Sequence, residues 1–150
     1  MSKPGSDLLV PARTRAAHRT RPSVLLAIAA GGAAGTPARY ALGRIVHVAP
    51  SGFPWATFVI NVSGSFVLGL LLTLVVERWP PTRFVRPFAA IGFLGAYTTF
   101  STYVVESDLL VKDGRVGVAA VYVVASLAAG FLAVYLGIVA ARLWPRRMEA

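Results

Sequence analysis

Four long apolar stretches, each with few charged residues, constrain this chain more than any other feature. They cover approximately residues 24–48, 53–76, 84–111 and 116–143. Each exceeds the roughly 20 residues that an α-helix needs to cross the core of a bilayer. Their apolar runs are continuous rather than alternating, which argues against the strands of a closed membrane barrel. The sequence therefore predicts an all-α integral membrane protein with four transmembrane helices.

The composition agrees with this prediction and excludes several classes of function. The chain is 56% hydrophobic and 14% charged, with a mean hydropathy of +0.66, whereas soluble proteins carry roughly 25% charged residues. The net charge of +9 could indicate nucleic acid, but the basic residues lie between or outside the apolar stretches and form no stripe along a helix. We expect no nucleic-acid partner. We also expect no enzyme, because the sequence offers no nucleophile–base set, paired carboxylates or phosphate-binding loop.

The chain divides into three parts. Residues 1–22 are rich in Arg, Pro and Ser and are predicted to form a disordered basic leader. A cleaved signal peptide is the less favoured alternative, because the apolar region that follows is longer than the usual core of about 7–15 residues. Residues 23–145 form the predicted four-helix transmembrane domain, and residues 146–150 form a short tail.

The basic residues are distributed unevenly between the two ends of the predicted helices. Eleven lie in the leader, around the loop between the second and third helices, and at the C-terminus, whereas Arg44, Lys112 and Arg115 lie at the opposite ends. The side with more Lys and Arg usually faces the cytoplasm. We therefore expect a multi-pass protein of the cell membrane with both termini in the cytoplasm.

Polar residues within the predicted helices are candidates for function, because they are costly in lipid. Arg39 follows Pro37 in the first predicted helix. Its position fits two interpretations equally well: a side chain that extends to the membrane interface, or a positive charge at the mouth of an anion path. Thr57, Asn61 and Ser65 recur every four residues on one face of the second helix. They could supply hydrogen-bond donors to an anion, although contacts between helices are the simpler interpretation.

The third helix carries the most specific signal. Residues 95–103 begin with a glycine and contain Thr98, Thr99, Ser101 and Thr102 at membrane depth. This pattern predicts a broken helix, which is tolerated in a membrane only where it is buried in protein or lines a cavity. Carbonyl groups freed at such a break can bind a cation, and the N-terminus of the following half-helix favours an anion.

Three further polar residues can be interpreted either as structural or as functional. Glu106, one turn beyond Tyr103, fits either a residue at the membrane interface or one that guards an ion path. Tyr122 and Ser126 lie four residues apart on the fourth helix, where a packing groove is the simpler explanation.

These motifs resemble those of a known family. The sequence GGAAGTPARY at residues 31–40 is similar to the first-helix motif of the Fluc (CrcB) fluoride channels. Thr57, Asn61, Val62 and Gly64 resemble the second-helix motif, and residues 92–102 resemble the highly specific third-helix signature. The resemblance extends over all four predicted helices, from about residue 24 to residue 143.

The resemblance implies a fluoride-selective channel that exports cytoplasmic fluoride passively, with pores at the interface of an antiparallel, dual-topology dimer. It implies a structural sodium ion bound by backbone carbonyls, which here belong to Gly95 and Thr98, and no organic cofactor. It places Arg39 in the aqueous vestibule. The implied fluoride pathway comprises Thr57, Asn61, Phe100, Ser101, Thr102, Tyr103, Glu106, Tyr122 and Ser126.

Two features depart from the usual pattern of that family. Tyr103 stands where a second phenylalanine is usual, so its hydroxyl changes the ring edge that faces an anion. The uneven loop charge does not fit a homodimer that inserts in both directions. We therefore favour a heterodimer with an oppositely oriented homologue over a homodimer.

Two other functions fit the four helices less well. A small multidrug exporter needs a carboxylate within its first helix, and residues 24–48 contain none. A membrane scaffold without transport activity would explain the glycines, but not the predicted break together with Asn61 and Arg39.

Overall fold

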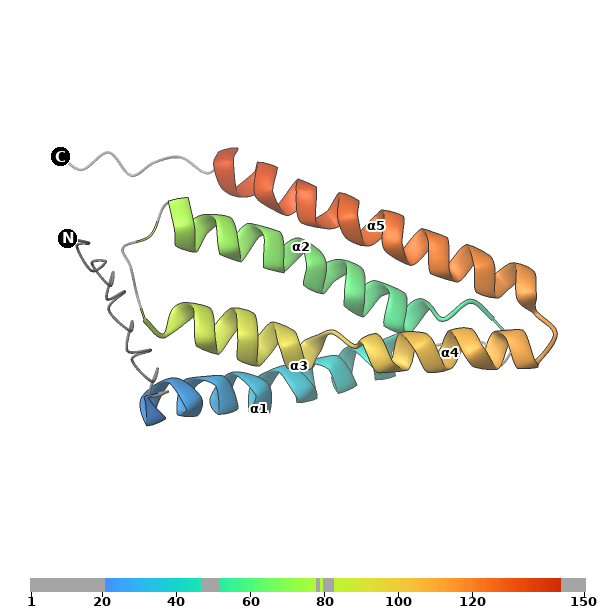
Figure 1. Cartoon of the computed structure of the whole chain (residues 1–150), viewed down its shortest axis with the longest axis horizontal. Coiled ribbons are helices and arrows are strands. Elements are labelled where there is room, and N and C mark those ends of the chain that lie inside the picture. Colours follow the sequence, from blue (N-terminus) through green and yellow to red (C-terminus); the bar gives the residue numbers. More distant parts are fainter. Residues whose placement is uncertain (1–20, 47–51, 78, 80–82, 144–150) are drawn as a thin grey trace, which may run out of the picture.

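The computed structural model describes residues 21–46, 52–77, 79 and 83–143, and this part of the chain is built from helices without strands (Figure 1). The predicted tail and all of the predicted leader except Arg21 and Pro22 lie outside the described residues. Pro22 already opens the first helix, as suits a residue that lacks a backbone N–H. The elements are α1 (Pro22–Ile45), α2 (Trp55–Glu77), η1 (Arg86–Leu94), α3 (Gly95–Tyr97), α4 (Phe100–Lys112) and α5 (Val116–Leu143).

The all-helical prediction is confirmed for the described residues. Three segments are long and apolar enough to cross a membrane, namely α2, the course from Arg86 to Lys112, and α5. Helix α1 has 24 residues and is therefore long enough as well, but Arg39 and Arg44 make it less apolar. The helices indicate a protein that crosses the membrane several times.

Residues 86–94 form a π-helix, which the sequence did not indicate. A π-helix closes its hydrogen bonds between residues five apart and is wider than an α-helix. Pro87 lies in its first turn, where its missing N–H leaves no helical hydrogen bond unmade. The wider segment runs directly into α3.

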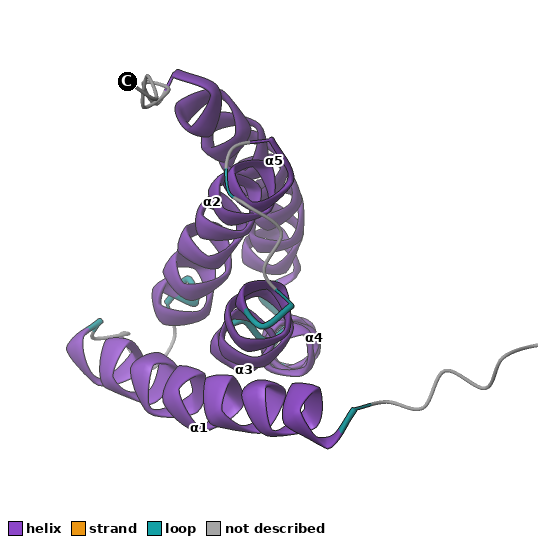
Figure 2. Ribbon diagram, turned by 90° about the vertical axis from the view of Figure 1, so that its left-hand side faces the viewer, coloured by secondary structure: helices purple, strands orange, loops and turns teal. Residues whose placement is uncertain are grey.

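The helices form two close pairs. Helix α1 packs along η1 and α3, and α2 packs along α5 (Figures 1 and 2). Glycines permit both close approaches. In α1, a Cβ at Gly31 or Gly35 would collide with backbone atoms of η1. In the α2–α5 pair, a Cβ at Gly69 or Gly137 would collide with backbone atoms of the opposite helix. Such small residues are the usual means by which membrane helices come close together.

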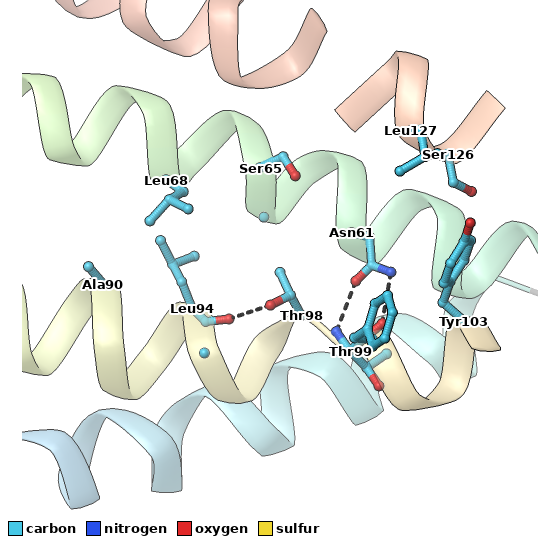
Figure 3. A pocket seen from close by; sticks show the side chains of 13 residues that line it. Asn61, Ser65, Leu68, Ala90, Leu94, Thr98, Thr99, Tyr103, Ser126 and Leu127 are labelled. Carbon is cyan, nitrogen blue, oxygen red and sulfur yellow. Dashed lines mark hydrogen bonds between the residues drawn. The ribbon is translucent and has the colours of Figure 1, made fainter. Parts of the chain in front are cut away.

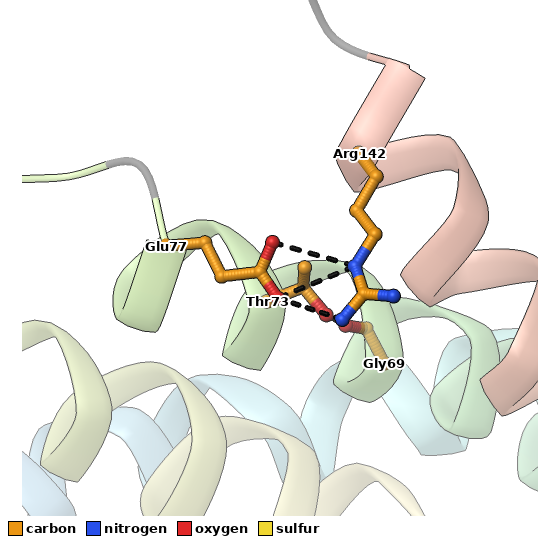
Figure 4. A network of polar contacts seen from close by, with 4 residues as sticks. All are labelled: Gly69, Thr73, Glu77 and Arg142. Atoms are coloured by element: carbon orange, nitrogen blue, oxygen red, sulfur yellow. Dashed lines mark hydrogen bonds and ion pairs between the residues drawn. The ribbon is translucent and has the colours of Figure 1, made fainter.

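An ion pair joins the ends of α2 and α5 that lie opposite the aromatic cluster of the fold. Arg142 Nη2 lies 2.9 Å from Glu77 Oε1, and Arg142 Nε donates to both carboxylate oxygens (Figure 4). One turn away, Thr73 Oγ1 donates to the Gly69 carbonyl at 2.8 Å. The ion pair is exposed and therefore contributes little to stability in water.

The opposite end of the fold holds a cluster of aromatic side chains. Tyr122 of α5 is fully buried and packs with Leu110, Phe53, Phe58 and Tyr103. Phe53 meets Tyr122 edge-on at 5.2 Å between ring centroids, which is a favoured geometry for aromatic pairs. This cluster binds α4 to the α2–α5 pair.

Candidate functional site

The helical course from Arg86 to Lys112 is interrupted at Thr98 and Thr99. Helix α3 ends at Tyr97 and α4 begins at Phe100. Between them, Thr98 has φ −77° and ψ 161°, and Thr99 has φ −147° and ψ 120°, both extended conformations. The backbone groups at this point cannot all be paired within the helix, so other partners must satisfy them.

The side-chain amide of Asn61 supplies two of these partners. Its Nδ2 donates to the Thr99 carbonyl at 3.0 Å, and its Oδ1 accepts from the Thr99 N–H at 2.9 Å (Figure 3). Thr99 is 8% exposed, so an unpaired peptide here would carry a substantial desolvation cost. The Asn61 side chain on α2 thus pairs with the Thr99 peptide of the interrupted helix in the way that a hydrogen-bonded backbone segment would.

This pairing leaves two carbonyl groups without their helical donors. In an uninterrupted α-helix the N–H of Thr99 would bond the Gly95 carbonyl, and the N–H of Thr102 would bond the Thr98 carbonyl. Here Thr99 N–H bonds Asn61, and Thr102 N–H bonds Thr99 Oγ1 at 3.2 Å. Thr99 therefore caps α4 in the manner of an N-cap threonine. Gly95 is exposed, and no atom lies within 4 Å of the position its Cβ would occupy.

A cavity of about 350 Å³ lies beside the interruption (Figure 3). Candidate residues from α2, from the interrupted α3–α4 course and from α5 line it. Phe100, at its edge, is 78% exposed and lies with its ring centroid 5.9 Å from that of Tyr103. The predicted site residues that line it are Asn61, Gly95, Thr98, Phe100, Tyr103 and Ser126.

A carboxylate connects three helices next to this cavity without lining it. Glu106 Oε1 accepts from Thr57 Oγ1 at 2.9 Å, and Glu106 Oε2 accepts from the Tyr122 hydroxyl at 2.8 Å. Thr57 is 4% exposed and Tyr122 is fully buried. Hydrogen bonds to a charged acceptor are stronger than neutral ones. The half-buried Glu106 of α4 is thus joined by hydrogen bonds to α2 and α5.

A second cavity of about 300 Å³ lies on the other side of Thr99. Arg39 and Arg44 line it together with Thr57, Thr99 and Thr102. Among the residues that the structure describes, Thr99 alone lines both cavities, so it lies at the boundary between them. The sequence indicated Arg44 only as a charge outside the membrane, whereas the structure places it with Arg39 in the lining of this cavity.

The structure does not bring every predicted residue into a cavity. Ser101 is exposed and lies 3.3 Å from Thr99 Oγ1 through its hydroxyl, but it lines neither cavity. Ser63, which the sequence analysis did not assign, bonds the Tyr97 hydroxyl at 2.8 Å. This bond attaches α3 to α2 just before the interruption. In the part of the chain that the structure describes, no cluster of acidic, His or Cys side chains could hold a metal ion.

The fold and the site define a class of protein: a multi-pass helical membrane protein whose cavities beside an interrupted helix contain several polar side chains. Comparison with known proteins identifies the family. The family described as CrcB-like protein, Camphor Resistance (CrcB), matches residues 26–138. The chain belongs to this family.

Individual relatives extend the comparison. The chain is 53% identical to "Fluoride-specific ion channel FluC 3" of Streptomyces avermitilis over 83% of its own length and 61% of the relative. It is 45% identical to "Fluoride-specific ion channel FluC 2" of Nocardia farcinica over 81% of its length and 86% of that relative. It is 40% identical to "Fluoride-specific ion channel FluC 1" of Streptomyces coelicolor over 93% of its length and 90% of that relative. The match thus spans less than two thirds of the first protein and most of the other two.

Replacing Asn61 by leucine tests whether its side-chain amide stabilises the interruption at Thr99. The variant removes both partners of the Thr99 peptide, and we expect the free energy of unfolding to fall by about 2–4 kcal/mol. Reversible unfolding of the purified protein in mixed micelles measures this change. Ser65→Ala is the matched control on the same helix face, since the Ser65 hydroxyl makes no hydrogen bond among the described residues. Equal stability of the two variants would contradict the role assigned to the Asn61 amide.

Proposed function

We propose that this chain forms a fluoride-selective channel that exports cytoplasmic fluoride passively. The observation that carries the proposal is a cavity with uncharged hydrogen-bond donors at an interrupted membrane helix, in a member of a family whose curated relatives are named fluoride-specific ion channels. The protein is a channel and not an enzyme. Its substrate is a small anion that crosses the bilayer without chemical change.

The physical requirement is to replace the water around fluoride. Donors at close range and the positive edges of aromatic rings can do this without a fixed charge that would hold the ion too tightly. Asn61 Nδ2 carries two protons, and only one is needed for the bond to the Thr99 carbonyl. The other proton and the edge of the Phe100 ring are available to an ion in the cavity.

The direction of transport follows from the chemistry of fluoride. Hydrogen fluoride is a weak acid that enters a cell as the neutral molecule and ionises inside. An inside-negative potential then drives the anion outward by about 2.3 kcal/mol per charge for each 100 mV. Arg39 and Arg44, at the second cavity, would raise the local concentration of anions at one mouth of the path. A passive pore is sufficient, so no nucleotide or proton coupling is required.

Dimerisation is part of the proposal. The cavity beside Asn61 is open on one side, where Phe100 and Gly95 are exposed. An antiparallel second subunit would cover this side and close the path to lipid. The same pairing gives the inverted symmetry that many transporters use to place sites near the bilayer midplane.

A structural sodium ion between the subunits is consistent with the freed carbonyls. Gly95 and Thr98 lose their helical donors to Asn61 and Thr99, so their oxygens are available to a hard cation. The ion would supply positive charge and fix the two interruptions against each other. We expect exchange of sodium for N-methylglucamine to lower the dimer fraction in detergent, measured by light scattering. The same dimer fraction in both salts would contradict this proposal.

The uneven loop charge supports insertion with both termini in the cytoplasm of the cell membrane, and pairing with an oppositely oriented homologue. C-terminal fusions to a reporter active in the cytoplasm and to one active outside it measure this orientation in cells. We expect activity almost entirely from the cytoplasmic reporter. An even division between the two reporters would instead support a dual-topology homodimer.

The alternatives are less well supported. Helix α1 contains no acidic residue, and a multidrug exporter would need one there. A scaffold without transport activity would not account for the cavity beside Asn61 or for the pairing of Asn61 with Thr99.

Fluoride efflux from liposomes tests the proposed function. We expect the reconstituted protein, with its paired homologue where one is needed, to release fluoride and retain chloride. We expect Asn61→Asp to stop efflux, because a fixed negative charge replaces a donor in the path. Gly117→Asp is the control, since it adds the same charge at a position in α5 with no atom within 4 Å of an added Cβ.

Vesicles that stay as impermeable to fluoride as protein-free lipid would overturn the assignment. Normal efflux through Asn61→Asp would instead remove Asn61 from the path.

A further inference from the structure

Three exposed arginines lie at one end of the fold. Within the described part of the chain, Arg21, Arg83 and Arg86 form no ion pair and no side-chain hydrogen bond. The described carboxylate at this end belongs to Glu77, and Arg142 already binds it. Neither α1 nor η1 has an acidic residue in its first turn. This end therefore carries positive charge that the described residues do not compensate.

The packing of α1 against η1 brings the arginines to the same end. The two helices run in the same direction, because Gly31 approaches the backbone of Phe88 and Gly35 approaches that of Phe93. Both helices begin at the end of the fold where α2 and α5 finish (Figure 1). Arg21 is the N-cap residue of α1, so it lies at the end where η1 also begins.

The start of η1 combines positive charge with exposed aromatic rings. The Phe88 N–H donates to the Phe84 carbonyl at 2.9 Å, so the backbone is already helical here. Arg83 and Arg86 lie three residues apart on this course, which places their side chains near one another on the helix surface. The Arg83 guanidinium lies over the Phe84 ring, 4.7 Å from its centroid. Phe84 and Phe88 are both exposed, so charged and apolar groups are presented side by side.

Trp79 indicates that this end lies at the surface of the membrane. It stands between α2 and η1 and is 45% exposed, and tryptophan is enriched where a membrane meets water. At that depth the arginines can contact lipid headgroups while the rings of Phe84 and Phe88 contact acyl chains. A phospholipid carries both kinds of group in one molecule, whereas a nucleic acid or an acidic protein does not.

We propose that Arg21, Arg83 and Arg86 form a binding surface for anionic phospholipid, with an acyl chain beside Phe84 and Phe88. A guanidinium group can donate two parallel hydrogen bonds to a phosphate, and basic residues close to a membrane attract anionic lipids. The inference goes beyond the proposed channel function and does not depend on it. Further positive charge reaches the same end from the leader, because three arginines closely precede Arg21 in the sequence: Arg13, Arg15 and Arg19.

Quenching of Trp79 fluorescence by brominated phospholipids tests this surface. The complete chain with Trp55→Phe and Trp144→Phe retains Trp79 as its single tryptophan, four residues before Arg83. It is reconstituted in mixtures of phosphatidylcholine and phosphatidylglycerol, with bromine on the acyl chains of one lipid or the other. We expect phosphatidylglycerol to quench Trp79 more than its share of the bilayer predicts, which gives a binding constant relative to phosphatidylcholine above one.

Glutamine variants assign the preference to the arginines. We expect Arg83→Gln and Arg86→Gln each to lower the relative binding constant by up to about fivefold, the effect of one arginine near an anionic surface. The double variant is expected to abolish most of the preference, and the double Arg→Lys variant, which keeps the charge, to preserve most of it. Circular dichroism checks that each variant is folded.

Two controls separate a local surface from a general effect of charge. Lys112→Gln removes one positive charge at the opposite end of the fold, where Lys112 pairs with Asp108 (Figure 1), and is expected to leave the constant at Trp79 unchanged. A second single-tryptophan chain retains Trp55, at the other end of α2. We expect this reporter to show no preference for phosphatidylglycerol.

Equal quenching of Trp79 by the two brominated lipids would overturn the proposal. A preference of the same size at Trp55, or one that survives both glutamine substitutions, would also contradict it. If the preference is lost only when Arg13, Arg15 and Arg19 are replaced by glutamine, the lipid binds the leader and the surface at the start of η1 is wrong.

Discussion

The pairing of the Asn61 amide with the Thr99 peptide is the interaction on which the rest of the site depends. A break in a membrane helix exposes backbone groups to a solvent that cannot satisfy them. Asn61 donates to the Thr99 carbonyl and accepts from its N–H, so both polar groups of that peptide are paired without a helical neighbour. Helix α2 therefore stabilises an extended conformation in a different part of the chain. The cost of the break is offset locally and does not need water.

The contact lies beside groups of opposite charge preference. The freed carbonyls belong to Gly95 and Thr98, which line the same cavity as Asn61. Carbonyl oxygens suit a cation, whereas N–H and O–H groups and ring edges suit an anion. Thr99 lies between the two cavities and also caps α4 through its own hydroxyl. The same few residues thus stabilise the extended backbone and separate the two cavities.

Hydropathy was sufficient to predict the helices, because lipid requires long apolar segments. Helix α1 begins and ends within about three residues of the predicted first span, and α5 coincides with the predicted fourth. The π-helix was not predictable, because apolar periodicity does not distinguish a wider turn within so short a segment.

The candidate site was only partly predictable. The types of residue in it were visible, because polar groups at membrane depth are rare. Their partners were not, since the bond between Asn61 and Thr99 depends on the register of two helices. The position of Arg44 in a cavity was not predicted, because a basic residue near the end of a membrane helix usually lies at the interface with water. Ser101 was assigned to the path by its neighbours, but it lines neither cavity.

The most direct test of this account is a dipolar-coupling measurement by solid-state NMR on the protein in lipid bilayers. With nitrogen-15 at Thr99 and carbon-13 at either the Asn61 side-chain carbonyl or the Gly95 backbone carbonyl, the experiment reports which group the Thr99 N–H approaches. The account predicts strong coupling to Asn61 and weak coupling to Gly95. Strong coupling to Gly95 would mean a continuous helix through this region, without freed carbonyls, and would contradict the account.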